Sequence, residues 1–230
     1  MYYILFTTNE SRYLHMLKIE NDRVSGWEAA IRGMRNPLNS WERMDSHIVW
    51  KEGREKALLG ENDLSLMKKL VRAGSDHRKF LRMLTVTCDI TAMQPWWAEF
   101  DTYKVGTVRN SCSKMHKIHA KPFTEADFAL EGAREIPYAM EGAKAMIGLC
   151  ERLRQDFNAT KEKKYWRALI ELLPEGYEMR ATVQLNYEVL LHMYYARKDH
   201  KLTEWHVLCD WMRGLPYFAE VCLQEDGSCV

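Results

Sequence analysis

The stretch LPEGYEMRATVQLNYEVLLHMYYARKDHKLTEW, residues 173–205, decides how this chain is interpreted. A proline and a glycine mark its start and do not recur within it, which predicts one long helix over residues 178–197. Asn186 and Arg197 are eleven residues apart, so on a helix they project from one face, about 16 Å apart along the axis. That face begins in an amide and ends in a guanidinium, which suits a ligand with a hydrogen-bonding edge and an anionic group.

A simpler interpretation applies to the same two residues. An asparagine in a helix is usually solvated or locally satisfied, and an arginine at a helix end usually complements the helix dipole. Leu190 and Met193 lie between them on the stripe, and a helix that needed only a core face would carry apolar residues at all four positions. The spacing alone favours the simpler interpretation.

The order of residues in this stretch resembles the C-terminal signature of the flavin-dependent thymidylate synthases. The matching positions run without a gap from the proline to the second arginine: Leu173-Pro174, Arg180, Asn186, Arg197 and Glu204-Trp205. In that family the Asn position faces the flavin and the late Arg binds the nucleotide, so the resemblance implies these roles for Asn186 and Arg197. His192 stands where the family has a second flavin-facing Asn.

An upstream segment resembles the central motif of the same family, an Arg-His-Arg triplet followed by a loop that contacts the uracil and phosphate of dUMP. The triplet corresponds to Thr102-Tyr103-Lys104, with one extra residue near Gly106. The loop corresponds to residues 110–115, in which Asn110 and Ser113 match the family, Ser111 replaces its acid, and Met115 replaces its Arg, beside Lys114.

The chemistry of this loop is informative without the family. Hydroxyls, an amide and cations, close in sequence to Trp96 and Trp97, are what a mononucleotide requires. An ordinary polar turn is the alternative, and the resemblance favours a ligand loop. Cys112 and His116 do not make a convincing nucleophile pair, because their spacing in a loop fixes no geometry and no third group is evident.

Other positions depart from the family. Phe80-Leu81-Arg82 stand where the family has an acid and a His beside the flavin, and Ile170 stands where it has a nucleotide-binding Arg. In the triplet, Thr removes one charge and Lys loses the bidentate fork of Arg. These losses predict a divergent branch, of the type associated with phage and phage-derived genomes and with thymidylate synthase complementing proteins.

Composition limits the alternatives. The chain has 230 residues, of which 47% are apolar, and this predicts a single domain over residues 1–230. A net charge of +1 argues against direct binding of nucleic-acid polymers or membrane surfaces, and no apolar run is long enough for a transmembrane helix. The first residues lack the pattern of a signal peptide.

Six scattered cysteines without a CxxC pair suggest free thiols in a reducing cytoplasm and no metal site.

Periodicity and turn signals predict the other elements. Strands are expected at residues 1–8, around 13–19 and at 83–90. Helices are expected from Gly26 to the Asn36-Pro37 stop and at residues 64–74, 138–157, 165–173 and 202–212. Arg32 and Arg35 fall on the last turn of the first helix, where they either complement its dipole or meet a phosphate.

The resemblance implies an α/β (α+β) fold with a central twisted, mostly antiparallel sheet and long packed helices, assembled as a homotetramer. It implies FAD as cofactor, a uracil deoxynucleotide as substrate, methylenetetrahydrofolate and NADPH as co-substrates, and a location in the cytoplasm, or the host cytoplasm if phage-encoded. The residues that it assigns are Ser113 and Lys114 to catalysis, Tyr103, Lys104, Asn110, Asn186 and His192 to the cofactor, and Ser111, Ser113, Arg180 and Arg197 to the substrate.

Two alternative functions stay open. A non-catalytic protein that kept the fold and a nucleotide pocket is favoured by the altered triplet and the missing acid and His. The retained Asn186, Arg197 and Ser113 favour the enzyme. A helical interaction protein without a small ligand is the third possibility, and it predicts that Asn186→Ala and Arg197→Ala leave every function intact.

Overall fold

The structure is a computed structural model that describes residues 17–223, so the predicted strand at residues 1–8, most of the one around 13–19, and residues 224–230 lie outside the described residues. The chain divides into two compact units. Unit 1 consists mainly of Ile90–Thr102 and Asn110–Ala181, and unit 2 of Ile19–Asp89, Tyr103–Arg109 and the segment from Thr182 onward. The single domain predicted from length and composition stays a prediction.

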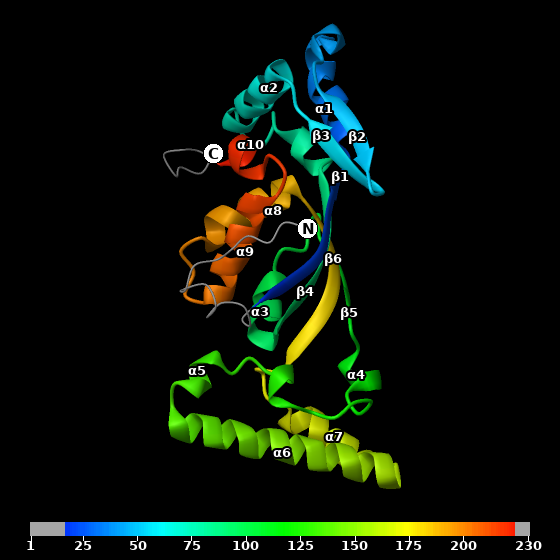
Figure 1. Cartoon of the computed structure of the whole chain (residues 1–230), viewed down its shortest axis with the longest axis vertical. Helices are drawn as coiled ribbons and strands as arrows, with labels where there is room; N and C mark the ends of the chain where they lie inside the picture. Colours follow the sequence, from blue (N-terminus) through cyan, green and yellow to red (C-terminus); the bar gives the residue numbers. More distant parts are fainter. Residues whose placement is uncertain (1–16, 224–230) are drawn as a thin grey trace. The chain divides into compact units, whose positions relative to one another are not determined.

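A four-stranded sheet has the strand order β1-β4-β6-β5 (Figure 1). Its strands are β1 (Lys18–Ser25), β4 (Thr85–Met93), β5 (Val108–Ser111) and β6 (Glu178–Asn186). Side chains alternate between buried and accessible positions along β4 and β6, as expected for strands with one covered face. The predicted mixed fold, with an antiparallel sheet and long helices, is confirmed.

The long helix predicted over residues 178–197 is wrong in its first half. The structure has strand β6 up to Asn186, followed directly by helix α8 (Tyr187–Arg197). Four buried residues alternate with polar ones along β6: Met179, Ala181, Val183 and Leu185. This period of two is the signal of a half-buried strand, and the absence of a glycine or proline concealed the change to helical periodicity.

Unit 2 contains most of the short elements. Its helices are α1 (Trp27–Arg35), α2 (Glu61–Arg72), α8, α9 (Thr203–Gly214) and α10 (Phe218–Cys222), with the 3-10 turns η2 (Asn36–Leu38), η3 (Trp41–Arg43) and η4 (Lys79–Arg82). Strands β2 (His47–Lys51) and β3 (Arg54–Leu58) form an antiparallel hairpin that the sequence interpretation missed. Glu52 and Gly53 at its tip both have positive φ, as a tight hairpin turn requires.

Aromatic edge contacts fill the core of unit 2. Trp27, which is 1% exposed, packs edge-on against Tyr187 and Tyr217, and Tyr187 packs edge-on against Phe218. The Tyr187 hydroxyl donates to the Pro216 carbonyl at 2.7 Å, which satisfies its polar atom. Trp27, Ala30, Ile31 and Met34 recur at helical spacing and are all buried, so they form the covered face of α1.

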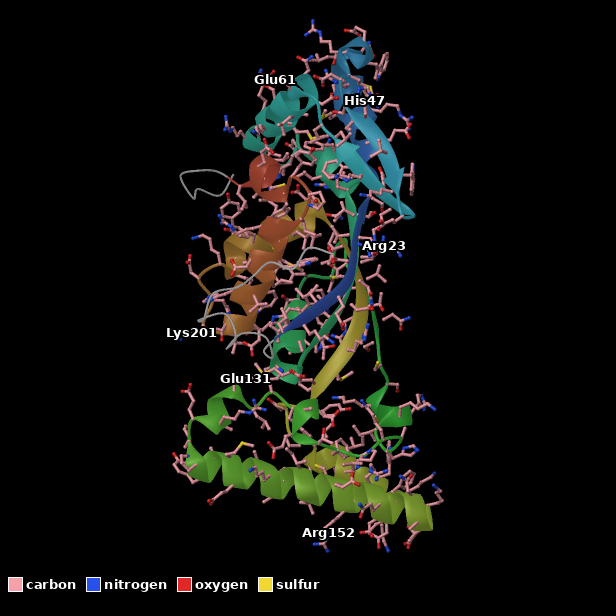
Figure 2. All side chains as sticks on the ribbon, in the orientation of Figure 1. Arg23, His47, Glu61, Glu131, Arg152 and Lys201 are labelled. Carbon is pink, nitrogen blue, oxygen red and sulfur yellow. The ribbon has the colours of Figure 1, made fainter. Side chains whose placement is uncertain are left out.

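Unit 1 is built around two packed helices, α6 (Pro137–Thr160) and α7 (Lys163–Leu172) (Figure 1). Its smaller elements are α3 (Gln94–Phe100), α4 (Lys114–Lys117), η5 (Glu125–Asp127) and α5 (Glu131–Arg134). Ile147 and Cys150 of α6 are buried against Leu169 of α7, as predicted for the inward face of the long helix. Arg152 lies on the outer face of α6 and points away from α7 (Figure 2). None of the helices in the described part of the chain combines the length and apolarity needed to cross a membrane.

A charged network ties the segment before η5 to α6. Glu151 accepts hydrogen bonds from the Arg154 guanidinium at 2.7 and 2.8 Å and from the backbone N–H of Phe123 at 3.0 Å. Asn158 donates to the His119 carbonyl at 3.0 Å from the same helix. The hydrogen bonds from Arg154 outweigh the effect of burial and lower the pKa of Glu151 to about 2.

Replacing Glu151 with Gln tests this network. Because the folded pKa lies below the unfolded value of about 4.3, the stabilisation is complete above that pH and is lost as the pH falls towards 2. We expect Glu151→Gln to lower the free energy of unfolding at pH 7 by on the order of 2 kcal/mol, and to flatten the pH dependence between about pH 4.5 and 2. Denaturant titration followed by circular dichroism measures both effects.

The matched control is Glu171→Gln, which removes a carboxylate from the exposed Arg167–Glu171 pair on α7. Exposed pairs contribute at most about 1 kcal/mol, so this variant is expected to change stability little. Equal losses in the two variants would show that the partly buried Glu151 network has no special role.

Candidate functional site

A cluster in unit 2 joins the segment after α3 to the end of α8 and the start of α9. The Nε of Arg197 donates to the Tyr103 hydroxyl at 2.8 Å. The guanidinium carbon of Arg197 lies 4.5 Å from the ring centre of Trp205 and 5.4 Å from that of Tyr103. His192 and His200 complete what we call the arginine–aromatic cluster, through edge contacts to Tyr103 and Trp205 respectively.

The geometry of this cluster fixes a cation against flat apolar surfaces. Trp205 is completely buried, whereas Arg197 is half-buried and lies on the last turn of α8. A guanidinium stacked on an indole and held through Nε has a defined orientation, which lowers the entropy lost when it binds an anion. The cluster therefore has the chemistry of an oxyanion-binding site with an aromatic wall.

Asn186 occupies the junction between β6 and α8. Its side-chain oxygen accepts from the backbone N–H of Val189 at 3.0 Å, which caps the helix. A Cβ placed on Gly106 would lie 2.9 Å from the Asn186 amide nitrogen and 3.0 Å from a methyl of Val189. The amide nitrogen therefore faces the Gly106 backbone, while the oxygen is used in the cap.

The stripe predicted between Asn186 and Arg197 is wrong. Leu190 and Met193 are both completely buried and belong to the core of unit 2. Asn186 and Arg197 lie at the two ends of α8, since one is the residue before the helix and the other is its last residue. Asn186 caps α8 and is not part of it, so the shared helix face does not follow from the spacing of eleven residues.

The residues predicted for the central loop belong to unit 1, and only part of that segment is a loop. Asn110 and Ser111 lie on strand β5, and both are exposed. Ser113 is the N-cap of the short helix α4, where its hydroxyl accepts from the His116 N–H at 3.2 Å. The Lys114 ammonium donates to the Gln94 side chain at 2.7 Å.

Two further predicted residues are accessible. Lys104 follows Tyr103 in the turn after α3 and is exposed. Arg180 is exposed on β6, and its backbone carbonyl accepts from the Cys112 N–H at 3.0 Å. The structure thus brings Tyr103, His192 and Arg197 together in one cluster, with Asn186 at the other end of α8.

The cysteines have different environments. Within residues 17–223 all five are free, and four of them are buried: Cys88, Cys150, Cys209 and Cys222. Burial raises the pKa of Cys88 and of Cys209 to about 12, and it also raises those of the other two, so these four thiols stay protonated at neutral pH. In the same part of the chain, no group of three or more His, Cys, Asp or Glu side chains is arranged to hold a metal ion.

The sequence interpretation gave no individual role to Trp205 or His200, and it counted Thr107 only among the hydroxyls of the ligand loop. Trp205 was noted as half of a Glu-Trp pair, yet its stacking on Arg197 follows only from the way α9 returns along α8. His200 lies in the turn between these helices. Thr107, next to Gly106, has a buried hydroxyl with no hydrogen-bond partner among the described residues. No local pattern indicates these contacts, because each depends on a tertiary approach.

Solved structures of two similar chains identify the fold. Thymidylate synthase X (ThyX) from Helicobacter pylori, in a crystal structure with FAD and dUMP, matches with a TM-score of 0.65 and 18% identity, covering 92% of this chain and 98% of that chain. A second H. pylori ThyX structure, complexed with FAD and dUMP, matches with a TM-score of 0.64 and 16% identity, covering 92% and 100%. The chain therefore has the fold of the flavin-dependent thymidylate synthases, at low sequence identity, as the resemblance implied. No family model and no curated protein sequence matches it.

Replacing Gly106 with Ala tests the close approach to Asn186. Gly106 has a φ of +78°, so a side chain adds backbone strain as well as the contact with the amide. Gly53 has a φ of +70° but nothing within 4 Å of a built Cβ, so Gly53→Ala reports the strain alone. We expect Gly53→Ala to cost about 1 kcal/mol and Gly106→Ala about 1–2 kcal/mol more, measured by denaturant unfolding. A Gly106→Ala variant no less stable than Gly53→Ala would contradict this close packing.

Proposed function

We propose that this chain is a divergent flavin-dependent enzyme that transfers a one-carbon unit to C5 of a uracil deoxynucleotide. FAD is the proposed cofactor and dUMP or a close analogue the substrate, with methylenetetrahydrofolate and NADPH as co-substrates. The observation that carries the proposal is the contact of Tyr103 with Arg197. It links the segment that resembles the family's triplet to the C-terminal signature, within a fold shared with ThyX.

The residues around Gly106 fit a flavin or nucleotide ring. The Asn186 amide nitrogen lies close against the Gly106 backbone, and the neighbouring Thr107 has a buried hydroxyl without a hydrogen-bond partner among the described residues. Heterocycles with carbonyl and imine edges require such donors and acceptors at close range. When bound, the flavin supplies the redox chemistry of the reaction, and the protein supplies binding and orientation.

The proposed roles follow the chemistry of each residue. Arg197 binds the nucleotide phosphate, because a guanidinium matches an oxyanion with two parallel hydrogen bonds. Asn186 and His192 hydrogen-bond the flavin, and Tyr103 offers a ring edge beside it. The remaining cofactor contacts are assigned to Lys104 and Asn110.

The unit 1 residues are assigned to the nucleotide and the reacting base. Ser111, Ser113 and Arg180 are proposed to bind the substrate through hydroxyls and a guanidinium. Lys114 is proposed to act with Ser113 near the uracil, where an ammonium stabilises developing negative charge. The Lys114 bond to Gln94 holds that ammonium in a defined position.

The oligomeric state and the cellular location of the enzyme are also proposals. The enzyme is proposed to form a homotetramer, as implied by the resemblance, and to work in the cytoplasm, or in the host cytoplasm if phage-encoded.

The altered triplet leaves fewer strong anion contacts for a pyrophosphate, and each charged hydrogen bond contributes about 1.5–3 kcal/mol. We therefore propose that FAD binds more weakly here than in relatives with the complete triplet.

A non-catalytic nucleotide-binding protein is the second candidate function. Phe80 and Leu81 stand where the family has groups beside the flavin, and they are 3% and 0% exposed. Phenylalanine and leucine side chains carry no hydrogen-bonding or titratable group, so neither of these two positions replaces the missing acid and His. This observation favours a protein that binds a nucleotide without flavin chemistry.

Absorbance between 350 and 500 nm separates the two candidates. We expect FAD added to the purified protein to show a perturbed flavin absorbance spectrum. We expect dUMP to change that spectrum further, because the two ligands would bind next to each other in the proposed site. Arg197→Ala is expected to weaken dUMP binding roughly 10- to 100-fold, as loss of a charged hydrogen bond predicts. Tyr103→Phe, which removes the hydroxyl that accepts from the Arg197 Nε, is expected to weaken it about 2- to 10-fold.

Arg152→Ala is the matched control, since it removes an exposed arginine from the outer face of α6. It is expected to leave both titrations unchanged. A protein that binds dUMP but ignores FAD would rule out the enzyme and support the non-catalytic function. A protein whose dUMP binding survives Arg197→Ala would refute the assigned phosphate site.

A further inference from the structure

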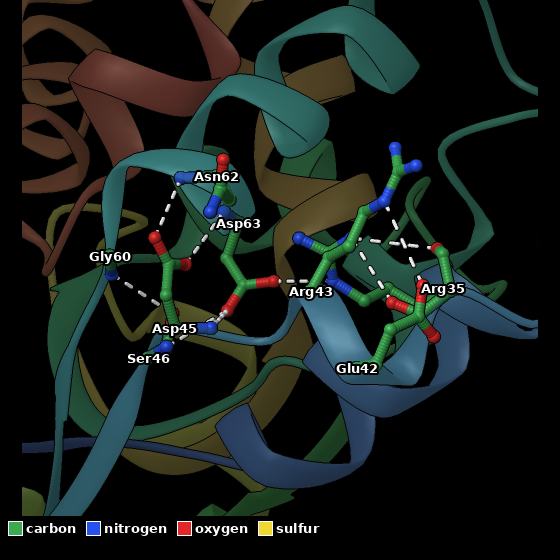
Figure 3. A network of polar contacts seen from close by, with 9 residues as sticks. Arg35, Glu42, Arg43, Asp45, Ser46, Gly60, Asn62 and Asp63 are labelled. Carbon is green, nitrogen blue, oxygen red and sulfur yellow. Dashed lines mark hydrogen bonds and ion pairs between the residues drawn. The ribbon is translucent and has the colours of Figure 1, made fainter.

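A buried ion pair lies between α1 and α2 in unit 2. Arg35 and Asp63 are 3% and 0% exposed, and the Arg35 Nε lies 2.7 Å from one Asp63 oxygen. The other Asp63 oxygen accepts the backbone N–H groups of Asp45 and Ser46 at 3.1 and 3.0 Å (Figure 3). Both oxygens of the carboxylate are therefore hydrogen-bonded, as burial of a charge requires.

The Arg35 guanidinium has fewer good hydrogen-bond partners than the Asp63 carboxylate. The Arg35 Nη1 reaches only the Ser40 carbonyl and hydroxyl, at 3.4 and 3.5 Å, which is the outer limit for a hydrogen bond. The Nη2 is buried and has no acceptor within residues 17–223. Buried donors without a partner are rare, and the two Nη groups of an arginine are shaped to hold an oxyanion.

Arg35 also lines a cavity of about 750 Å³, which is the size of a small-molecule site. Four cations line this cavity against two carboxylates, and the cations are Arg35, Arg43, Lys69 and Lys79. Leu66, Leu70 and Phe80 give it an apolar wall. A cationic rim, an apolar wall and an unsatisfied guanidinium together fit a ligand with an anionic head and an apolar body.

We propose that this cavity binds a phosphate monoester that carries an aromatic or apolar group. The phosphate oxygens accept from Arg35 Nη1, which holds the Ser40 groups only weakly, and from the unpartnered Nη2. Lys69 and Lys79 neutralise the remaining charge, and the apolar group packs on Phe80. No residue of the arginine–aromatic cluster lines this cavity, so the proposal does not rest on the proposed function.

The probe is AMP, with adenosine as the matched compound without phosphate, titrated by calorimetry in the absence of flavin. We expect AMP to bind and adenosine to bind much more weakly. The double variant Lys69→Glu, Lys79→Glu is expected to raise the Kd of AMP at least about tenfold, because both replacements repel the phosphate. Arg72→Glu is the control, since Arg72 is exposed on α2 outside this cavity, and its effect is expected to stay within about twofold.

Arg35→Lys tests the central contact, because it keeps the charge beside Asp63 and removes both Nη groups. We expect a folded protein, as judged by its circular dichroism, with weaker AMP binding. Three results would overturn the proposal: no binding of AMP by the original chain, equal losses in the double variant and in Arg72→Glu, or AMP binding that disappears in Arg197→Ala but persists in the double variant. The last result would assign AMP to the arginine–aromatic cluster instead.

Discussion

The cap that Asn186 makes on α8 is the constraint on which the arrangement of unit 2 depends. One side-chain oxygen ends the strand and starts the helix at the same residue, by accepting the Val189 N–H. The eleven residues of α8 then carry the chain to Arg197, which α9 meets with Trp205. If the strand ended one residue later, the buried face of α8 would rotate by about 100°, and Leu190 and Met193 would leave the core.

The position of this junction explains why sequence reasoning recovered the fold but assigned the segment before Asn186 to the helix. Long amphipathic segments such as α6 show their inward residues directly, and Ile147 and Cys150 are buried as their spacing predicts. The stretch before Asn186 has a strand pattern, but nothing in its composition separates it from the helix that follows. The family signature was found because it depends on spacing along the chain, which does not change when part of a helix becomes a strand.

Contacts between distant segments could not be predicted in the same way. Gly106 approaches Asn186, and Arg197 stacks on Trp205, because turns bring distant segments of the chain together. The local sequence around each residue does not show which distant segment it will meet. The buried pair of Arg35 and Asp63 is a similar case. Arg35 was considered either as a complement to the helix dipole or as a phosphate contact, whereas the structure pairs it with a carboxylate from another helix. In each case individual residues were noticed and the contact between them was not.

The distribution of thiols has a practical consequence for studying this protein. Four of the cysteines in the described part of the chain are buried and protonated, and Cys112 is exposed beside Ser113 and Lys114. Alkylating reagents react with accessible thiolates, so among residues 17–223 they select Cys112. In a chain whose Cys229 is replaced, a fluorophore attached there would sit next to the two residues proposed for catalysis and would report ligand binding.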